Sequence, residues 1–148
     1  MKYFAYGSNM ALDQMKLRCP DSSLIGPAQL KNHRLDFTRF SSGWNCGVAD
    51  VIDDPSQSVW GLLFSISKRD LIALDRYEGY PTCYSRKMVS VFCNEELHED
   101  TIVYYVVSKS SFQKPNKEYI DIILNTSYKY TFPDIYCNYL KDMIKKDE

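Results

Sequence analysis

YFAYGSNM, running from Tyr3 to Met10, predicts a strand that leads into a tight turn and then into a helix. Tyrosine and phenylalanine favour strands, and Gly7 allows another group to approach the backbone closely. Asn9 is a suitable N-cap for the apolar pattern that follows, so we expect a helix over about Met10 to Leu17. The N-terminus of a helix can bind a carboxylate or phosphate, because its N–H groups are unpaired and the positive end of the helix dipole lies there. The alternative is that this stretch is an ordinary strand–turn–helix corner that binds no ligand.

Most of the remaining chain has the pattern of strands. Runs of strand-forming residues bounded by turn signals predict strands at Ala28–Phe40, Val48–Ile52, Val59–Ile66, Lys87–Cys93 and Thr101–Val107. The motif Asp53-Asp54-Pro55 is expected to join the second of these strands to the third. Because strands dominate and pair locally, with helices between them, we expect an α+β fold rather than a doubly wound sheet.

Three further segments have helical signals. A capping-box arrangement predicts a short helix that starts at Ser67, with Asp70 three residues further on, and ends at Gly79. Apolar residues at helical spacing predict another helix around Tyr119 to Tyr128. Pro133 is expected to open the last helix, because proline is favoured in a first helical turn.

Composition restricts the class of function. The 18 basic and 19 acidic residues give a formal net charge of −1, so we expect no basic surface that recruits nucleic acid. The longest apolar runs, such as Ile102 to Val107, are too short to span a bilayer, and the first residues do not resemble a signal peptide. We therefore expect a cytoplasmic protein with one domain, residues 1–148, and no membrane association. The oligomeric state does not follow from the composition.

The cysteines do not predict a metal site. They are odd in number, and none forms a CxxC pair or a Cys/His cluster with zinc-like spacing, so we expect no metal. No GxSxG elbow surrounds Ser8, which argues against a serine triad. The sequence has no loop typical of cofactor binding, and no cofactor is expected. Cys83, which lies in a second informative stretch, is a candidate reactive thiol.

This second stretch is LDRYEGYPTCY, Leu74 to Tyr84. Together with YFAYGSN near the start and VWGLLF at Val59 to Phe64, it resembles the γ-glutamylcyclotransferase family, which includes AIG2-like and γ-glutamylamine cyclotransferase proteins. Shorter matches follow in the same order along the chain: LRCP at Leu17–Pro20, LDF at Leu35–Phe37, GVADVI at Gly47–Ile52 and FPDIY at Phe132–Tyr136. The resemblance implies a small mixed β-barrel flanked by helices.

The resemblance also implies an intramolecular reaction. In this family the α-amine of a γ-glutamyl group attacks its own γ-carbonyl, which closes the ring of 5-oxoproline and releases an amine or an amino acid. Such an enzyme, a transferase or lyase by class, needs neither a nucleophile of its own nor a cofactor. It must fold the flexible glutamyl chain, move protons and stabilise the oxyanion on the carbonyl.

Glu78, in the EG motif, is the residue that the resemblance implies for proton transfer. The sequence offers an independent reason, because Glu78 lies at the negative end of a short predicted helix, with Asp75 three residues earlier. Both effects disfavour the carboxylate and are expected to raise its pKa, which suits a general acid or base. The alternative is a solvated glutamate that pairs with Arg76 or Lys68.

The N-terminal corner is then the expected substrate-binding half. Its backbone N–H groups are candidates to hold the α-carboxylate or the γ-carbonyl oxygen of the substrate, or both: Gly7, Ser8, Asn9 and Met10. Asn9 is expected mainly to cap the helix or to brace the loop. Tyr6 is a candidate for the site, the core or both. Three more tyrosines match, by their order in the chain, tyrosines that line the family's cavity: Tyr84, Tyr105 and Tyr119.

The sequence does not determine which group the reaction releases. Asn9 stands where the glutathione-specific branch carries leucine, so the resemblance favours γ-glutamyl amino acids, γ-glutamyl amines or a larger γ-glutamylated product over glutathione. One alternative to an enzyme of this kind is a non-catalytic member of the fold that binds a small ligand or a protein. Another is an unrelated hydrolase or acyltransferase that uses Ser8 or Cys83.

Overall fold

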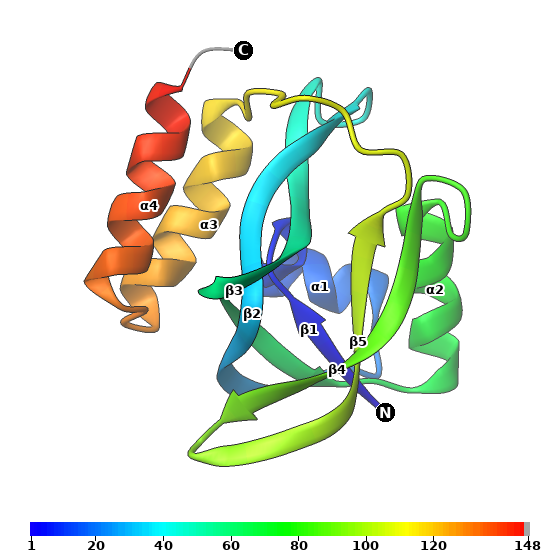
Figure 1. The fold of residues 1–148 in the computed structure, drawn as a ribbon. Coiled ribbons are helices and arrows are strands. Elements are labelled where there is room, and N and C mark those ends of the chain that lie inside the picture. Colours follow the sequence, from blue (N-terminus) through cyan, green and yellow to red (C-terminus); the bar gives the residue numbers. More distant parts are fainter. Residues whose placement is uncertain (147–148) are drawn as a thin grey trace.

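A closed β-barrel forms the centre of the molecule in the computed structural model, which describes residues 1–146 (Figure 1). In order around the barrel, the strands are β1 (Lys2–Ala5), β3 (Cys46–Ser65), β2 (Ser23–Ser41), β4 (Tyr84–Cys93) and β5 (Glu96–Val106). Neighbouring strands pair antiparallel, except that β5 and β1 pair in parallel and so close the barrel. The α+β class and the mixed barrel flanked by helices are confirmed.

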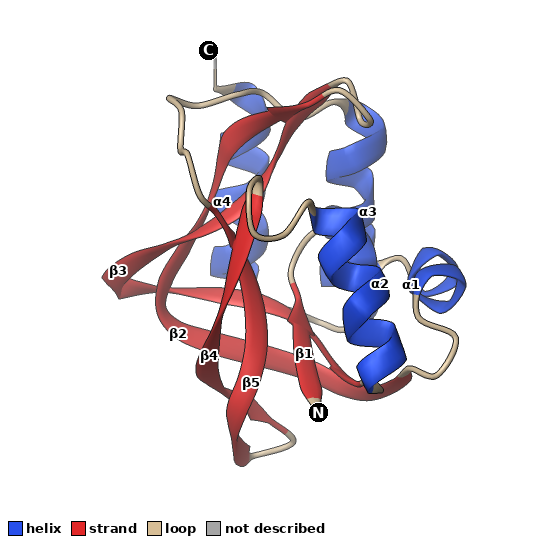
Figure 2. Ribbon diagram, turned by 90° about the vertical axis from the view of Figure 1, so that its right-hand side faces the viewer, coloured by secondary structure: helices blue, strands red, loops and turns tan. Residues whose placement is uncertain are grey.

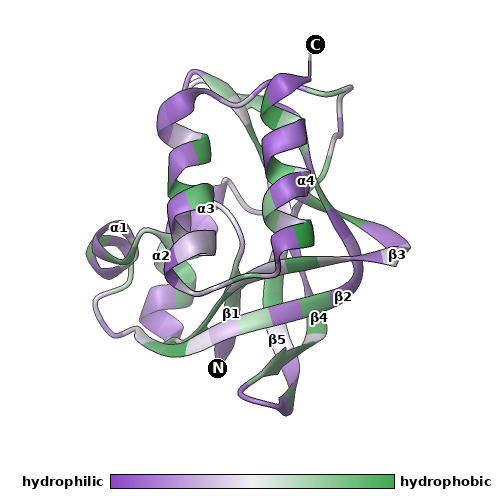
Figure 3. Cartoon of the chain, turned by 90° about the vertical axis from the view of Figure 1, so that its left-hand side faces the viewer, coloured by the Kyte–Doolittle hydropathy of each residue, from purple (hydrophilic) through white to green (hydrophobic). Residues whose placement is uncertain are grey.

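Helices cover two sides of this barrel. On one side lie α1 (Leu12–Arg18) and α2 (Lys68–Glu78), which contact each other near β1 (Figure 2). On the other side, α3 (Lys117–Lys129) and α4 (Asp134–Lys145) lie side by side, and hydrophilic and hydrophobic residues are interspersed along both (Figure 3). Both C-terminal helices were predicted, α3 from its apolar spacing and α4 from Pro133, which lies directly before it as the N-cap. Among residues 1–146, no helix is long and apolar enough to cross a membrane.

The two longest strands, β2 and β3, form one extended hairpin. We expected two strands at Val48–Ile52 and Val59–Ile66, joined at Asp53-Asp54-Pro55, but β3 runs without interruption through all three segments. The expected Ala28–Phe40 strand likewise extends over the whole of β2. The prediction of two short strands was wrong because β2 is long enough to pair with both halves of β3 in turn.

A register shift accommodates the bend of this hairpin. The pairing changes from Lys31 opposite Ser58 to His33 opposite Asp53, so extra residues of β3 lie between the two paired stretches. Such bulges bend a strand and increase its twist. Pro55 falls in the part of β3 that has no paired residue on β2, where a proline does not remove a ladder hydrogen bond.

The corner after β1 begins with a single 3₁₀ turn, η1 (Ser8–Met10), and α1 follows it. The predicted helix therefore starts later than expected, and its N-cap is Ala11 rather than Asn9. The Asn9 side chain instead donates from Nδ2 to the Tyr3 hydroxyl at 3.0 Å and accepts at Oδ1 from the Arg18 guanidinium. Asn9 thus braces the corner against β1 and α1, which was the second role expected for it.

The ends of α2 agree with the prediction. The Ser67 hydroxyl accepts from Asp70 N at 3.1 Å, and the Asp70 carboxylate accepts from Ser67 N at 3.2 Å, which completes the capping box. Gly79 ends the helix in the left-handed conformation, with φ of 67°, which glycine adopts without the steric penalty of a side chain. Glu78 is therefore the last residue of α2.

Candidate active site

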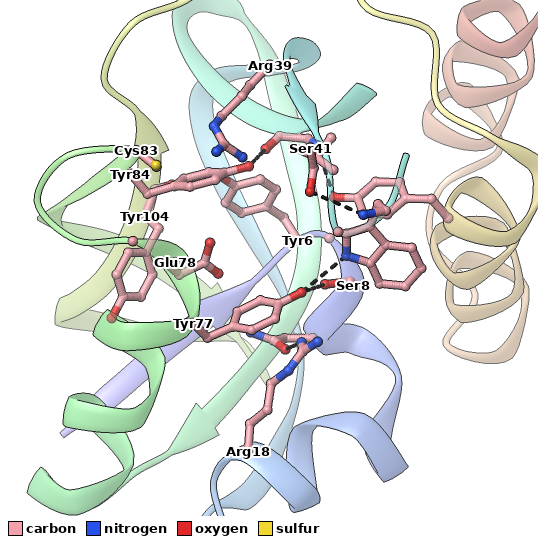
Figure 4. Close-up of a pocket in the computed structure, with 18 of the residues that line it drawn as sticks. Tyr6, Ser8, Arg18, Arg39, Ser41, Tyr77, Glu78, Cys83, Tyr84 and Tyr104 are labelled. Atoms are coloured by element: carbon pink, nitrogen blue, oxygen red, sulfur yellow. Dashed lines mark hydrogen bonds between the residues drawn. The ribbon is translucent and has the colours of Figure 1, made fainter. Parts of the chain in front are cut away.

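A cavity of about 580 Å³ opens between the N-terminal corner, the end of α2 and the β2–β3 hairpin (Figure 4). Its size falls within the range of roughly 300–1,000 Å³ that is typical of small-molecule sites. Most of the residues singled out from the sequence line this cavity: Tyr6, Gly7, Ser8, Asn9, Glu78, Cys83, Tyr84 and Tyr119. The fold thus brings the two informative stretches of sequence to one place.

The corner presents fewer N–H groups than expected. Met10 does not line the cavity, since its side chain is buried and its N–H donates to Gly7 O at 3.1 Å. The 3₁₀ turn therefore uses this amide internally. By contrast, the amides of Gly7, Ser8 and Asn9 have no hydrogen-bond acceptor among residues 1–146. These three N–H groups belong to residues that line the cavity.

Of the two adjacent tyrosines of β5, Tyr104 lines the cavity and Tyr105, which was singled out from the sequence, does not. Tyr104 lines the cavity and is buried, whereas the Tyr105 ring lies 5.8 Å from Lys87 Nζ and 5.6 Å from Lys109 Nζ, away from the cavity residues. Successive side chains of a strand point to opposite faces. The run IVYYVV is apolar or aromatic throughout, so the sequence does not reveal which tyrosine faces the barrel side.

The Glu78 carboxylate is the central ionisable group of the cavity. Figure 4 shows it projecting into the space between the rings of Tyr6, Tyr77 and Tyr84. It forms no hydrogen bond or ion pair with the rest of residues 1–146, so it is not a glutamate paired with Arg76 or Lys68. The carboxylate is left for a ligand.

Burial raises the pKa of Glu78 to about 7, against the opposing charges of Arg18 and Arg39, which favour the ionised form. The direction matches the sequence expectation, but the cause does not. Asp75, which we expected to contribute, faces other partners. It accepts from Arg86 Nε at 2.9 Å and from the Tyr104 hydroxyl at 2.6 Å.

Two tyrosine hydroxyls bind the backbone of the same residue, Ala49, in the cavity wall. Tyr84 donates to Ala49 O at 2.8 Å, and Ala49 N donates to the Tyr119 hydroxyl at 3.0 Å. Because it accepts from Ala49, the Tyr119 hydroxyl keeps its own proton for a further acceptor. A Cβ at Gly7 would lie 2.8 Å from the Tyr119 oxygen, so the close approach of this hydroxyl to the corner requires glycine.

The rim of the cavity is formed by residues that the sequence analysis missed. The Arg18 guanidinium lies 3.4 Å from the centre of the Tyr77 ring, and the Tyr77 hydroxyl accepts from Trp44 Nε1 at 3.2 Å and lies 3.4 Å from Ser8 Oγ. Tyr77 could have been suspected as the neighbour of Glu78. The positions of Arg18 and Trp44 depend on tertiary packing and had no local signal.

A closed barrel with an isolated carboxyl group in a tyrosine-lined cavity has the features of a domain that acts on a small molecule. The model of the family described as γ-glutamyl cyclotransferase, AIG2-like, matches residues 3–129. The chain therefore belongs to the γ-glutamyl cyclotransferase, AIG2-like family.

Individual relatives agree with this assignment. The γ-glutamylcyclotransferase of Homo sapiens is 28% identical over 149 residues, which cover 98% of this chain and 79% of the relative. That of Mus musculus is 28% identical over 143 residues, covering 94% and 76% respectively. A solved structure of a γ-glutamyl cyclotransferase superposes with a TM-score of 0.88 at 27% identity, over 100% of this chain and 90% of that one. These relatives support an enzymatic activity of the family for this chain.

Proposed function

We propose that this protein is a γ-glutamylcyclotransferase that forms 5-oxoproline from a γ-glutamyl substrate and releases an amine or an amino acid, with Glu78 as general acid and base. The observation that carries the proposal is the isolated Glu78 carboxyl group, with a pKa of about 7, in the same cavity as the corner amides. A group with this pKa is present in both protonation states near neutral pH, which suits it to accept a proton and return it.

The proposed reaction requires two protons to be carried from the attacking nitrogen to the leaving nitrogen. The Glu78 carboxylate takes a proton from the substrate's α-ammonium, and the resulting amine attacks the γ-carbonyl. As the tetrahedral intermediate collapses, protonated Glu78 gives this proton to the leaving nitrogen. The Glu78 carboxylate then takes the second proton from the ring nitrogen and passes it to the departing amine, which leaves as an ammonium ion. One C–N bond forms and one breaks, and no water is consumed. Glu78 is ready for the next cycle once the product amine leaves.

The remaining groups of the cavity are proposed to bind and orient the substrate. The amides of Gly7, Ser8 and Asn9, together with the hydroxyl of Tyr119, are donors for the α-carboxylate and for the oxyanion on the γ-carbonyl. The aromatic walls restrict the glutamyl chain so that its amine meets its own carbonyl, an entropic contribution that can reach several kcal/mol.

The test is a product assay with a panel of γ-glutamyl amino acids and γ-glutamyl amines. We expect 5-oxoproline and the free amine or amino acid in equal amounts. A hydrolase that uses Ser8 or Cys83 would release glutamate instead and would lose activity in Ser8→Ala or Cys83→Ser. A protein that binds these compounds but releases neither 5-oxoproline nor glutamate would contradict the proposal and indicate a binding module.

A further inference from the structure

We propose that Arg39 selects substrates whose leaving group carries a carboxylate, so that γ-glutamyl amino acids rather than γ-glutamyl amines are the preferred class. This inference rests on the proposed function, because it assigns the part of the substrate that departs. It concerns a different end of the cavity from the corner amides.

Arg39 is directed into the cavity from β2. The pairing of β2 with β3 shifts register between Phe37 and Arg39, and bulges of this kind re-aim side chains next to active sites. The side chain is half-buried, and its guanidinium carbon lies 5.9 Å from the centre of the Tyr84 ring. Figure 4 shows the guanidinium extending from the strand toward the interior, on the side where Glu78 lies.

The Arg39 guanidinium has no carboxylate partner among residues 1–146, whereas other arginines do. Arg86 pairs with Asp75 at 2.9 Å, and Arg34, on the same strand as Arg39, lies 3.6 Å from Asp36. Partial burial removes water from a charged group, and this loss is compensated only when the group finds a charged or hydrogen-bonding partner. A guanidinium offers paired donors that match a carboxylate. We therefore infer that an anionic group of the ligand pairs with the Arg39 guanidinium.

The second cation near the carboxyl group, Arg18, is already engaged. It donates to Asn9 Oδ1 and stacks on the Tyr77 ring at 3.4 Å. Its role is to hold the corner and the rim in place. Arg76 also lines the cavity, but it is exposed, whereas Arg39 is half-buried. Arg39 is therefore the cation of the cavity that is best placed to bind an anion of the substrate.

The geometry favours the carboxylate of the leaving group over that of the glutamyl group. Figure 4 places Ser8, in the corner, and Arg39 on different sides of the Glu78 carboxylate. The corner already offers three amides to the glutamyl α-carboxylate or the γ-carbonyl. Since Glu78 must reach both the attacking and the leaving nitrogen, the leaving group extends past it toward Arg39. An amino acid places its carboxylate two bonds from that nitrogen, whereas a simple amine has none.

The experiment compares γ-glutamyl-alanine with γ-glutamyl-ethylamine, which differ only in this carboxylate. Binding is measured by calorimetry in the Glu78→Gln background, alone and combined with Arg39→Gln, and 5-oxoproline release is measured with and without Arg39→Gln in the chain that keeps Glu78. Arg34→Gln is the matched control, because Arg34 lies on the same strand outside the cavity. Urea unfolding shows that each variant is folded.

We expect γ-glutamyl-alanine to bind about 10- to 100-fold more tightly than γ-glutamyl-ethylamine, the range for a hydrogen-bonded charge pair. Arg39→Gln should bring this ratio close to one, and Arg34→Gln should leave it unchanged. A ratio that is the same with and without Arg39, or an equal loss for both ligands, overturns the inference. If the ratio depends on Arg39 but no 5-oxoproline forms, the proposed function fails, while recognition of this carboxylate by Arg39 stands. If neither ligand binds, both fail.

Discussion

The half-buried acid at the end of α2 should make the protein less stable as the pH rises. Burial raises the pKa of Glu78 from 4.5 to about 7 in the folded state. Between these two values the folded protein retains a proton that the unfolded chain has released, so the free energy of unfolding decreases with increasing pH. The contribution of the protonated group is fully present below about pH 4.5 and is lost as the pH passes through about 7.

The size of this effect follows from the difference between the two pKa values. One pKa unit corresponds to ~1.4 kcal/mol, so ionised Glu78 should destabilise the folded protein by roughly 3 kcal/mol relative to the neutral group. About 2.5 kcal/mol of this develops between pH 5 and pH 8. Glu78→Gln replaces the acid by a neutral group of the same shape. Between pH 5 and pH 8, the free energy of unfolding of the variant should therefore increase by about 2.5 kcal/mol relative to that of the natural sequence.

Urea unfolding of both proteins across this pH range measures the effect. The difference between the two free energies cancels the titration of groups that the substitution does not touch. Glu118→Gln is the control, because Glu118 lines the same cavity but is exposed. A Glu78→Gln difference that stays constant with pH would show that the carboxylate is solvated in the folded protein. That result would refute the claim that burial adjusts its pKa.

Two further substitutions test how the cavity is held together. Gly7→Ala should lower kcat/KM at least about tenfold, because the new Cβ would lie 2.8 Å from the Tyr119 oxygen. Gly43→Ala is the control and should have little effect, since its Cβ would lie 3.7 Å from the nearest neighbouring atom. Similar activity of the two variants would contradict this reasoning. Asp75→Asn should reduce the unfolding free energy by about 1–2 kcal/mol, because its hydrogen bonds with Arg86 and Tyr104 become weaker. The midpoint of the kcat/KM–pH profile should not move. A midpoint that moves would assign Asp75 to the acid–base chemistry.

Features that depend on local chemistry could be predicted from the sequence. The capping box at Ser67 and the glycine end of α2 were correct, because a few adjacent side chains decide both. The position of Glu78 at the helix end followed from them. The barrel itself was inferred from the ordered resemblance to the family and not from the strand pattern alone.

Features that depend on distant partners could not be predicted. The continuity of β3 across Pro55 is decided by the length of β2, which lies opposite it. Asn9 is not a cap because Tyr3 and Arg18 bind its side chain. Arg39 is directed into the cavity next to a register shift between Phe37 and Arg39. The neighbouring residues contain no signal that predicts this shift.

The most direct test of proton transfer by Glu78 is the rate of 5-oxoproline release by Glu78→Gln, measured together with substrate binding by calorimetry. We expect the variant to bind its γ-glutamyl substrate while kcat falls at least about 100-fold, the lower end for the loss of a general acid–base. Glu118→Gln, which removes another carboxylate from the same cavity, should keep most of the activity. A Glu78→Gln variant that cyclises its substrate at the natural rate would contradict this role.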